Sequence, residues 1–424
     1  MNKERNNPWK IEDEKAHTFS TQEWWCLESF FDSIEDKKKW CLRAYLWEWT
    51  ENSKKNWSLF NFTLFDLTTK KHIKYNPRRA TLLEKAKDRF DVRFEDSFIR
   101  GRYPIYEMYF KDKKNNLSLK INYQAEALPH WVAQEATKGW LPMGLGLFRY
   151  GFIPKGLTSG TIQTNNKSFS LRGKGYFEHV WGDFSFKKPL NISFSLKKII
   201  SIYAKLFGWW RYNNRIHIPK SIMLSTENNP FGNDWAWALF ENGWTIFYGN
   251  ILFWVMEGPA TGILILSKDG KNYTEFGNIH FKYKKIRYAK DYDFVYPSKI
   301  ELTAQKGKEK LFLCLEMTSK SREFVERYSG GKYWLGLVVC ETPGKIEGYY
   351  SDGSKKVRLS GVCKMEPQRQ ISRLGHNTMK VDLILPPNGV GLYTELSSHF
   401  LKKKINVLIR LVPNPSFGFR SQRF

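Results

Sequence analysis

The densest group of reactive side chains lies in residues 173–183, which read GKGYFEHVWGD. This segment contains two carboxylates, an imidazole, a phenol, an indole and three glycines. Carboxylates, imidazoles and phenols are the groups that proteins use as general acids and bases. Proton transfer is therefore the chemistry that this segment can support.

The segment reads as a β-strand that begins and ends at glycines, which allow unusual backbone angles or close approach. Side chains alternate along a strand, so two sets are expected: Phe177, His179, Trp181 and Asp183 on one face, and Tyr176, Glu178 and Val180 on the other. Glu178 and His179 reach one pocket only if a β-bulge near a glycine twists the strand. In a regular strand, Asp183 is the better candidate acid. The same composition also fits an ordinary aromatic strand with paired charges.

Several reaction classes are disfavoured. The sequence has no glycine-rich phosphate loop, no histidine cluster with zinc spacing and no Gly-x-Ser-x-Gly motif. These absences disfavour nucleotide-dependent transfer, zinc hydrolysis and α/β-hydrolase chemistry, and we expect no metal site. Acid–base chemistry in an aromatic pocket remains.

Four segments resemble, in order, the signatures of a lipocalin-like family that includes carotenoid 1,2-hydratase (hydroxyneurosporene synthase) and AttH-like proteins. Residues 173–183 resemble its Gly-x-Gly-Tyr-x-Asp-His-x-Trp-Gly signature, and residues 22–26 (QEWWC) resemble its Glu-Trp-Trp-Tyr signature. Residues 234–243 (DWAWALFENG) and 333–336 (YWLG) resemble its later motifs. The resemblance spans roughly residues 17–365 and implies an all-β fold of two tandem antiparallel lipocalin-like (calycin) barrels.

The resemblance implies a hydro-lyase that adds water to an isoprenoid double bond without a cofactor. Glu178 occupies the family's Asp position and is the implied acid, while His179 or Asp183 would orient or deprotonate water. The implied ligand-binding residues are Tyr176, Trp181, Trp237, Trp24, Trp25, Glu23 and Trp235. The expected partner is a hydrophobic small molecule, an isoprenoid or a lipid.

The chain departs from the family pattern at four positions. Glu178 replaces Asp, Val180 replaces Asn, Cys26 replaces Tyr and Leu335 replaces Glu. The carboxyl group remains, so proton donation remains chemically feasible. Two other functions therefore stay open, a non-catalytic carrier of a lipid or other hydrophobic ligand and a cofactor-free isomerase or cyclase.

The chain of 424 residues is too long for one ordinary core, and turn signals between short strand patterns favour two β domains. The expected parts are a disordered N-terminus (1–16), a first barrel (17–190), a connecting segment (191–220), a second barrel (221–371) and a partly stranded extension (372–424). Residues 117–125 alternate between apolar and polar. Residues 79–90 fit a short helix or an irregular crossing. Residues 130–161 fit a tight β-meander at a barrel rim. Residues 235–254 fit a hairpin with an Asn-Gly turn.

Residues 196–211 have apolar side chains at helical spacing with lysines opposite, which predicts an amphipathic helix. Three roles are open: a helix packed on its own barrel, a lid over the barrel mouth, or peripheral contact with a membrane.

The formal net charge is +26, and the basic residues are spread along the chain. The favoured explanation of this charge is a basic surface exposed to solvent. The next is a surface that contacts an anionic membrane. No nucleic-acid-binding module is recognisable, so we expect no nucleic-acid partner. Five cysteines without a CxxC pair indicate reduced thiols. The N-terminus lacks the apolar segment of a signal peptide, which predicts a cytoplasmic protein, either soluble or peripheral to a membrane.

Overall fold

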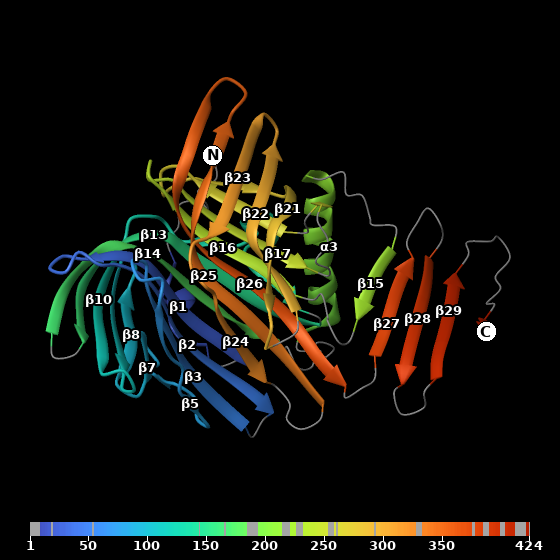
Figure 1. The fold of residues 1–424 in the computed structure, drawn as a ribbon, viewed down its shortest axis with the longest axis horizontal. Helices are drawn as coiled ribbons and strands as arrows, with labels where there is room; N and C mark the ends of the chain where they lie inside the picture. The colour runs from blue at the N-terminus through green and yellow to red at the C-terminus, as the bar shows by residue number, and fades with distance from the viewer. Residues whose placement is uncertain are drawn as a thin grey trace.

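The computed structural model describes residues 9–17, 20–52, 55–143, 145–164, 167–184, 194–213, 221–225, 232–252, 258–259, 262–291, 294–327, 333–374, 378–384, 390–398, 403–411 and 421–423. Two large antiparallel sheets, each curled into a half-barrel, lie against each other, and a smaller sheet lies beyond helix α3 (Leu196–Asn213) (Figure 1). The predicted all-β architecture of two lipocalin-like units in tandem is confirmed.

Within the described residues, the first half-barrel has fourteen strands. They are β1 (Gln22–Ser33), β2 (Lys39–Asn52), β3 (Lys55–Asp66), β4 (His72–Tyr75), β5 (Arg78–Arg79), β6 (Glu84–Lys85), β7 (Phe90–Phe94), β8 (Ser97–Arg102), β9 (Ile105–Asp112), β10 (Leu117–Ala125), β11 (His130–Trp131), β12 (Trp140–Met143), β13 (Gly146–Thr164) and β14 (Lys167–Asp183). Their order is β4-β3-β2-β1-β14-β13-β10-β9-β8-β7-β6, with β5 on β3 and both β11 and β12 on β13. The segment richest in reactive groups is thus the central strand β14, held between β1 and β13.

The second half-barrel has eleven strands in the part of the chain that the structure describes. They are β16 (Gly232–Phe240), β17 (Thr245–Leu252), β18 (Gly258–Pro259), β19 (Gly262–Ser267), β20 (Tyr273–Phe276), β21 (Asn278–Ala289), β22 (Phe294–Lys306), β23 (Glu309–Met317), β24 (Arg322–Arg327), β25 (Tyr333–Ser351) and β26 (Lys356–Leu374). The order is β18-β21-β22-β23-β25-β26-β16-β17-β19-β20, with β24 on β25. The predicted hairpin is formed by β16 and β17, and Gly243 has the positive φ (+84°) that its tight turn requires. Residues 253–254 of that prediction lie outside the described residues.

The third sheet joins distant parts of the chain. It contains β15 (Ser221–Ser225), β27 (Thr378–Ile384), β28 (Val390–Ser398), β29 (Lys403–Leu411) and β30 (Ser421–Arg423). The second barrel was predicted to begin at residue 221, but β15 pairs with β27 and therefore belongs with the C-terminal extension. The predicted boundary between residues 190 and 191 lies outside the described residues.

Large apolar side chains fill the concave face of each half-barrel. In the first sheet, Trp25, Phe60 and Tyr106 are among the largest fully buried side chains. In the second, Tyr248 and Phe276 belong to an equivalent cluster. A third apolar cluster combines residues of both sheets with residues of α3. The interiors of the half-barrels are therefore packed cores, and the ligand cavity has to be sought between them.

Residues 1–16 were predicted to be a disordered tail, but residues 9–16 pack on the first sheet. Residues 1–8 lie outside the described residues. Trp9 is buried against Trp131 and Phe177, and α1 (Ile11–Glu14) follows it. The physical reason is the apolar area of the Trp9 indole, whose burial stabilises the fold enough to hold a short polar segment in place. This segment covers the inner face of the first sheet.

Two further segments depart from simple pattern reading. Residues 79–90 form short strand pairs with no helix between them. In 130–161, the glycines do not mark turns of a meander, because most of them lie in the single long strand β13. A Cβ atom at Gly151 would lie 2.6 Å from the Trp131 ring, and one at Gly156 would lie 2.4 Å from the Tyr123 ring. These glycines therefore make room for neighbouring aromatic rings. The alternation predicted for 117–125 is confirmed in β10.

Helix α3 lies over the seam between the sheets. Ile199, Ile202, Leu206 and Trp210 are buried, so the helix packs on its own protein, as one of the three predicted roles requires. α2 (Gln134–Thr137) contacts it. Among the described residues, no helix combines the length and hydropathy needed to cross a bilayer.

Candidate functional site

A cavity of about 190 Å³ lies between the two half-barrels, beneath α3. That volume is several times the ~30 Å³ that one water molecule occupies in the liquid, so it suits a small organic group better than a single structural water. Its aromatic and aliphatic wall includes Trp24, Tyr45, Trp47, Val132, Leu141, Met143, Phe148, Tyr150, Leu206, Trp209, Trp210, Trp235, Phe247 and Ile263. Its polar groups include Glu28, Arg43, Glu178, Asn233, Asn250, Glu366 and Gln368. The site is thus a mostly apolar hollow with one polar side.

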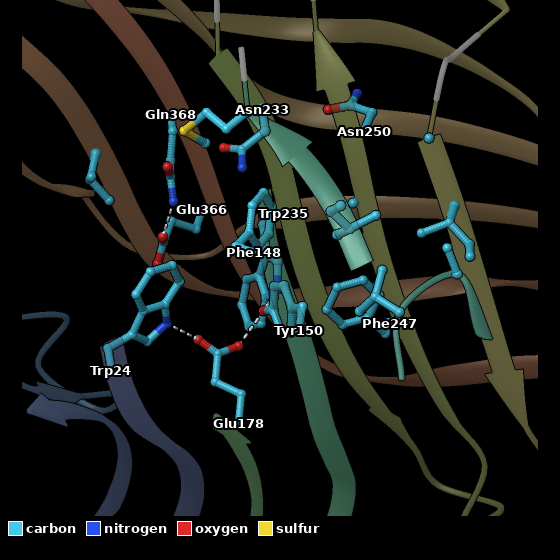
Figure 2. A pocket seen from close by; sticks show the side chains of 18 of the residues that line it. Trp24, Phe148, Tyr150, Glu178, Asn233, Trp235, Phe247, Asn250, Glu366 and Gln368 are labelled. Atoms are coloured by element: carbon cyan, nitrogen blue, oxygen red, sulfur yellow. Dashed lines mark hydrogen bonds between the residues drawn. The ribbon is translucent and has the colours of Figure 1, made fainter. Parts of the chain in front are cut away.

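Glu178 lies at the aromatic end of this cavity, with 6% of its surface exposed (Figure 2). Its Oε1 accepts a hydrogen bond from Trp24 Nε1 at 3.0 Å. Its Oε2 accepts one from the Tyr176 hydroxyl at 2.7 Å and another from the Tyr150 hydroxyl. Three neutral donors from three strands therefore converge on one carboxyl group.

The two phenols beside Glu178 are held as neutral donors. Burial, and then the charge of Glu178, raise the pKa values of Tyr150 and Tyr176 well above the ordinary value for tyrosine. Trp235 Nε1, from the second half-barrel, donates to the Tyr150 hydroxyl oxygen at 3.0 Å. The hydrogen bonds around Glu178 therefore connect both sheets.

The strand register explains how these groups meet. β14 pairs with β1 without interruption. In the pairing of β14 with β13, Tyr150 of β13 lies opposite Val180 of β14. Because side chains alternate, Tyr176 and Glu178 share the face that looks toward the second sheet. A register shift lies in β13, between Ile153 and Gly156, rather than in β14 next to its own glycines. β14 therefore keeps a regular alternation through Glu178 and His179.

His179 consequently lies on the other side of the sheet from Glu178, and the alternative that both share one pocket is wrong. Its ring is fully buried, and burial lowers its pKa below the ordinary value for histidine. Nε2 lies 2.9 Å from Glu23 Oε1, and the ring stacks on Trp25 with 4.7 Å between centroids. His179 thus cannot contact a ligand beside Glu178.

Asp183 does not belong to the cavity wall either. It is partly buried near the end of β14, where it pairs with Leu147 of β13, and burial raises its pKa. The expectation that a regular strand would make Asp183 the better acid is therefore wrong, because the regular strand directs Glu178 into the cavity. Of the three candidate catalytic residues, Glu178 alone lines it.

The predicted ligand-binding residues divide between the two faces of the sheet. Trp24 and Trp235 line the cavity. Tyr176 supports Glu178 from behind, and Trp237 packs on Tyr176 and donates to the carbonyl of Pro154 at 2.8 Å. The remaining three, Trp25, Trp181 and Glu23, surround His179 on the opposite face.

Sequence reasoning missed most of the cavity wall, above all Tyr150, Phe148 and Phe247. Tyr150 and Phe148 occur in the glycine-rich stretch that suggested a rim. Their alternation along one strand was a readable signal. That they face Glu178 depends on the pairing of β13 with β14 and could not be read from the sequence.

A buried ionic network joins the two sheets beside the cavity, and its members Glu28, Arg43 and Glu366 line the polar side of the cavity. Arg43 of β2 lies 2.8 Å from Glu341 of β25 and 3.4 Å from Glu28 of β1. Lys364 of β26 lies 3.2 Å from Glu28. Burial raises the pKa of Glu28 to about 7, against the pull of Lys364 and Arg43. For Glu341 burial is outweighed by Lys364, Arg43 and Arg322, which lower its pKa to about 2.

Comparison with known proteins establishes the fold. No family model and no curated protein sequence matches the chain. Two solved structures share its architecture, each with a TM-score of 0.54. One is a protein from Nitrosomonas europaea, provisionally assigned as an AttH, which is 14% identical and covers 85% of this chain and 97% of its own. The other is kievitone hydratase from Nectria haematococca, which is 12% identical with coverages of 84% and 92%. At these identities the likeness shows a shared fold alone.

Proposed function

We propose that this protein binds a hydrophobic small molecule between its half-barrels and hydrates a carbon–carbon double bond in it. The observation that carries the proposal is Glu178, a buried carboxyl group that opens onto the aromatic end of a mostly apolar cavity. The fold is shared with a protein named as a hydratase. The substrate class we propose is an isoprenoid alkene, of which carotenoids are one kind.

In the proposed first step, Glu178 in its acid form transfers its proton to one alkene carbon, leaving a tertiary cation on the other. The donors Trp24, Tyr150 and Tyr176 hydrogen-bond more strongly to the carboxylate that results than to the neutral acid, so they stabilise the product of this transfer. The faces of the surrounding indole rings stabilise the cation, an effect of about 2 kcal/mol when the cation is desolvated.

In the second step, water attacks the cation, and the Glu178 carboxylate takes the proton that this water loses. The net change is alkene plus water to alcohol, and Glu178 returns to its acid form. These two steps need neither His179 nor Asp183. The proposed reaction therefore differs from the expectation that one of these residues orients or deprotonates the water. One group therefore acts in turn as acid and base.

The experiment compares Glu178→Gln with Asp183→Asn. Lipophilic material co-purified from the native host is identified by mass spectrometry, and isoprenoids of that class are assayed for a product heavier by one water. We expect Glu178→Gln to abolish turnover while retaining ligand binding, and Asp183→Asn to retain both. Undiminished turnover by Glu178→Gln would refute the role of Glu178.

A non-catalytic carrier is the second candidate function, because the three hydrogen bonds also satisfy Glu178 as a purely structural carboxylate. In that case the wild-type protein and Glu178→Gln both bind the ligand and neither forms a hydrated product. A rearranged or cyclised product of unchanged mass would instead identify an isomerase or cyclase.

We also propose that α3 touches an anionic membrane surface from which the ligand enters. Leu196, Ile200 and Phe207 are exposed on this helix, close to the exposed Lys197 and Lys205. Such a combination of apolar and basic groups is typical of interfacial helices. Flotation with anionic liposomes tests this: we expect the double substitution Ile200→Ser and Phe207→Ser to reduce the floating fraction, and an unchanged fraction would contradict the proposal.

A further inference from the structure

A second cluster of reactive groups lies on the opposite face of β14 from Glu178. It consists of His17, Glu23 and His179, whose potential ligand atoms all lie within 4.8 Å of one another. Glu23 Oε1 is 2.7 Å from His17 Nδ1 and 2.9 Å from His179 Nε2. Two imidazole nitrogens thus converge on one carboxylate oxygen, and the proposed hydration uses none of these groups.

The contacts of His179 orient its ring so that Nε2 faces Glu23. His179 Nδ1 lies 2.8 Å from the main-chain carbonyl oxygen of Asp13, which can only accept a hydrogen bond. Nδ1 therefore carries a hydrogen, and Nε2 is the ring nitrogen that faces the Glu23 carboxylate. A contact of 2.9 Å between Nε2 and Glu23 Oε1 holds either a proton, as in an ordinary hydrogen bond, or a metal ion bound to both atoms. A histidine whose other nitrogen donates to a carbonyl is the usual arrangement of a metal ligand.

The other ligands are held as firmly as His179. The His17 main-chain N–H donates to both oxygens of Glu23, at 3.1 and 3.0 Å. The His17 ring stacks on Trp181 with 4.2 Å between centroids, and the His179 ring stacks on Trp25. Glu23 and His179 are fully buried. The three groups are therefore preorganised in a site largely shielded from water, where a bound ion would exchange slowly.

We propose that His17, Glu23 and His179 bind a divalent transition-metal ion of the Zn²⁺ class. Two imidazoles and one carboxylate suit Zn²⁺, which bonds to nitrogen and oxygen at about 2.0–2.2 Å, and small shifts of the side chains reach that geometry. A water molecule can complete the coordination. The sequence was expected to contain no metal site, because these ligands lack the spacing of a zinc motif and come together only when β1 pairs with β14.

The metal would fasten the N-terminal segment to the first half-barrel. His17 belongs to the segment that also carries Trp9 and α1, whereas Glu23 and His179 belong to β1 and β14. One ion would therefore link the segment to two central strands. Because β14 separates this cluster from Glu178, the inference does not depend on the proposed hydration.

The test uses the full-length chain without a histidine tag, freed of metal by chelator. Zn²⁺ is added, excess is removed by gel filtration, the metal is counted by mass spectrometry, and affinity is measured by calorimetry. We expect one tightly bound Zn²⁺ per chain and a higher unfolding temperature with Zn²⁺. His17→Gln should weaken binding at least tenfold and remove most of the increase in unfolding temperature.

His130→Gln is the matched control. His130 Nε2 makes a similar contact with Glu275, at 3.0 Å, but belongs to no such three-residue group in the part of the chain that the structure describes. We expect this variant to bind Zn²⁺ as the wild type does. The inference would be overturned if the wild type retained less than a tenth of an equivalent of Zn²⁺, or if His17→Gln bound Zn²⁺ as tightly as the wild type. The three residues would then be a hydrogen-bonded triad without a metal.

A second measurement covers the case in which His17→Gln does not fold. Co²⁺ added to the metal-free wild-type protein should give the visible absorption of a nitrogen- and oxygen-ligated ion, saturating at one equivalent, and Zn²⁺ should displace it. No such absorption at one equivalent would overturn the inference.

Discussion

Glu341 should be the residue whose neutralisation most weakens the contact between the half-barrels. It lies on β25, is fully buried, and accepts a hydrogen bond from Thr63 of β3. Arg43 of the first sheet lies 2.8 Å away, and Lys364 of the second lies 3.7 Å away. The substitution Glu341→Gln keeps the shape of the side chain and removes its charge, leaving these cations buried with less compensation.

The magnitude follows from the pKa. Neighbouring cations outweigh burial and lower the pKa of Glu341 to about 2 from an ordinary 4.5, and this difference corresponds to about 3 kcal/mol at ~1.4 kcal/mol per unit of pKa. Removing one partner of a buried ion pair typically costs about 3–5 kcal/mol. We therefore expect Glu341→Gln to lower the free energy of unfolding by about 3 kcal/mol.

The assay is urea unfolding followed by tryptophan fluorescence and by circular dichroism. Because the network joins the two sheets, we expect the first transition to move to lower urea and the two sheets to unfold more separately. Glu347→Gln is the control on the same strand: its side chain is 62% exposed, 3.9 Å from Lys345, and such a surface pair contributes about 1 kcal/mol or less. Equal shifts for the two variants would refute the assigned strength of the network.

The difference between the wild type and Glu341→Gln should also depend on pH in one direction. A carboxyl group whose folded pKa is lowered contributes stability that is fully present above its unfolded pKa and is lost as the pH falls through the folded value. The difference should therefore be constant above pH 4.5 and shrink between pH 4.5 and about 2. A difference that persists unchanged at pH 2 would contradict the ionic explanation.

Three further predictions concern other parts of the molecule. Tyr150→Phe removes a hydrogen-bond donor to Glu178. Because a hydrogen bond to a charged group contributes about 1.5–3 kcal/mol, turnover should fall roughly 10- to 100-fold while ligand binding is retained. An unchanged kcat would exclude Tyr150 from the reaction. Burial raises the pKa of Glu14 to about 7, so its contribution is fully present below pH 4.5 and is lost as the pH rises through 7. The unfolding temperature of the wild type should fall between pH 4.5 and about 7 and then level off, and Glu14→Gln should fall less over this range, keeping only the part due to Glu28; an equal fall in both proteins would contradict the assignment. In Gly208→Ala on α3, the added Cβ atom has no other atom within 4 Å. This substitution should raise the free energy of unfolding by about 0.5–1 kcal/mol. A loss of stability would show that the helix needs glycine at this position.

Local patterns predicted much of the fold. The alternation in 117–125, the Asn-Gly turn at 242–243 and the helical spacing in 196–211 each reflect interactions between neighbouring residues, and each became the expected element. Residues 9–16 were misread, because the burial of Trp9 depends on a surface that the rest of the chain provides. Propensity and periodicity report local preferences and carry little information about such distant contacts.

The candidate site shows the same division. The alternation along residues 173–183 was enough to separate Glu178 from His179 once the strand proved regular. Which of the two faces the cavity was not readable, because it depends on where the second half-barrel lies. Tyr150 reaches Glu178 from the preceding strand β13, and Trp235, which hydrogen-bonds to Tyr150, comes from the second half-barrel, 85 residues from Tyr150.

By itself, the sequence determined an all-β chain with a central strand rich in acid–base groups, because alternation and turn preferences are local properties of the residues. Tertiary structure alone decided that the cavity lies between two packed half-barrels, that Glu178 opens into it, and that His17, Glu23 and His179 meet behind it. The physical reason is that strand pairing and sheet contact bring together groups that are distant in the chain, such as Glu23 and His179, which are 156 residues apart, and no spacing within the sequence encodes those contacts.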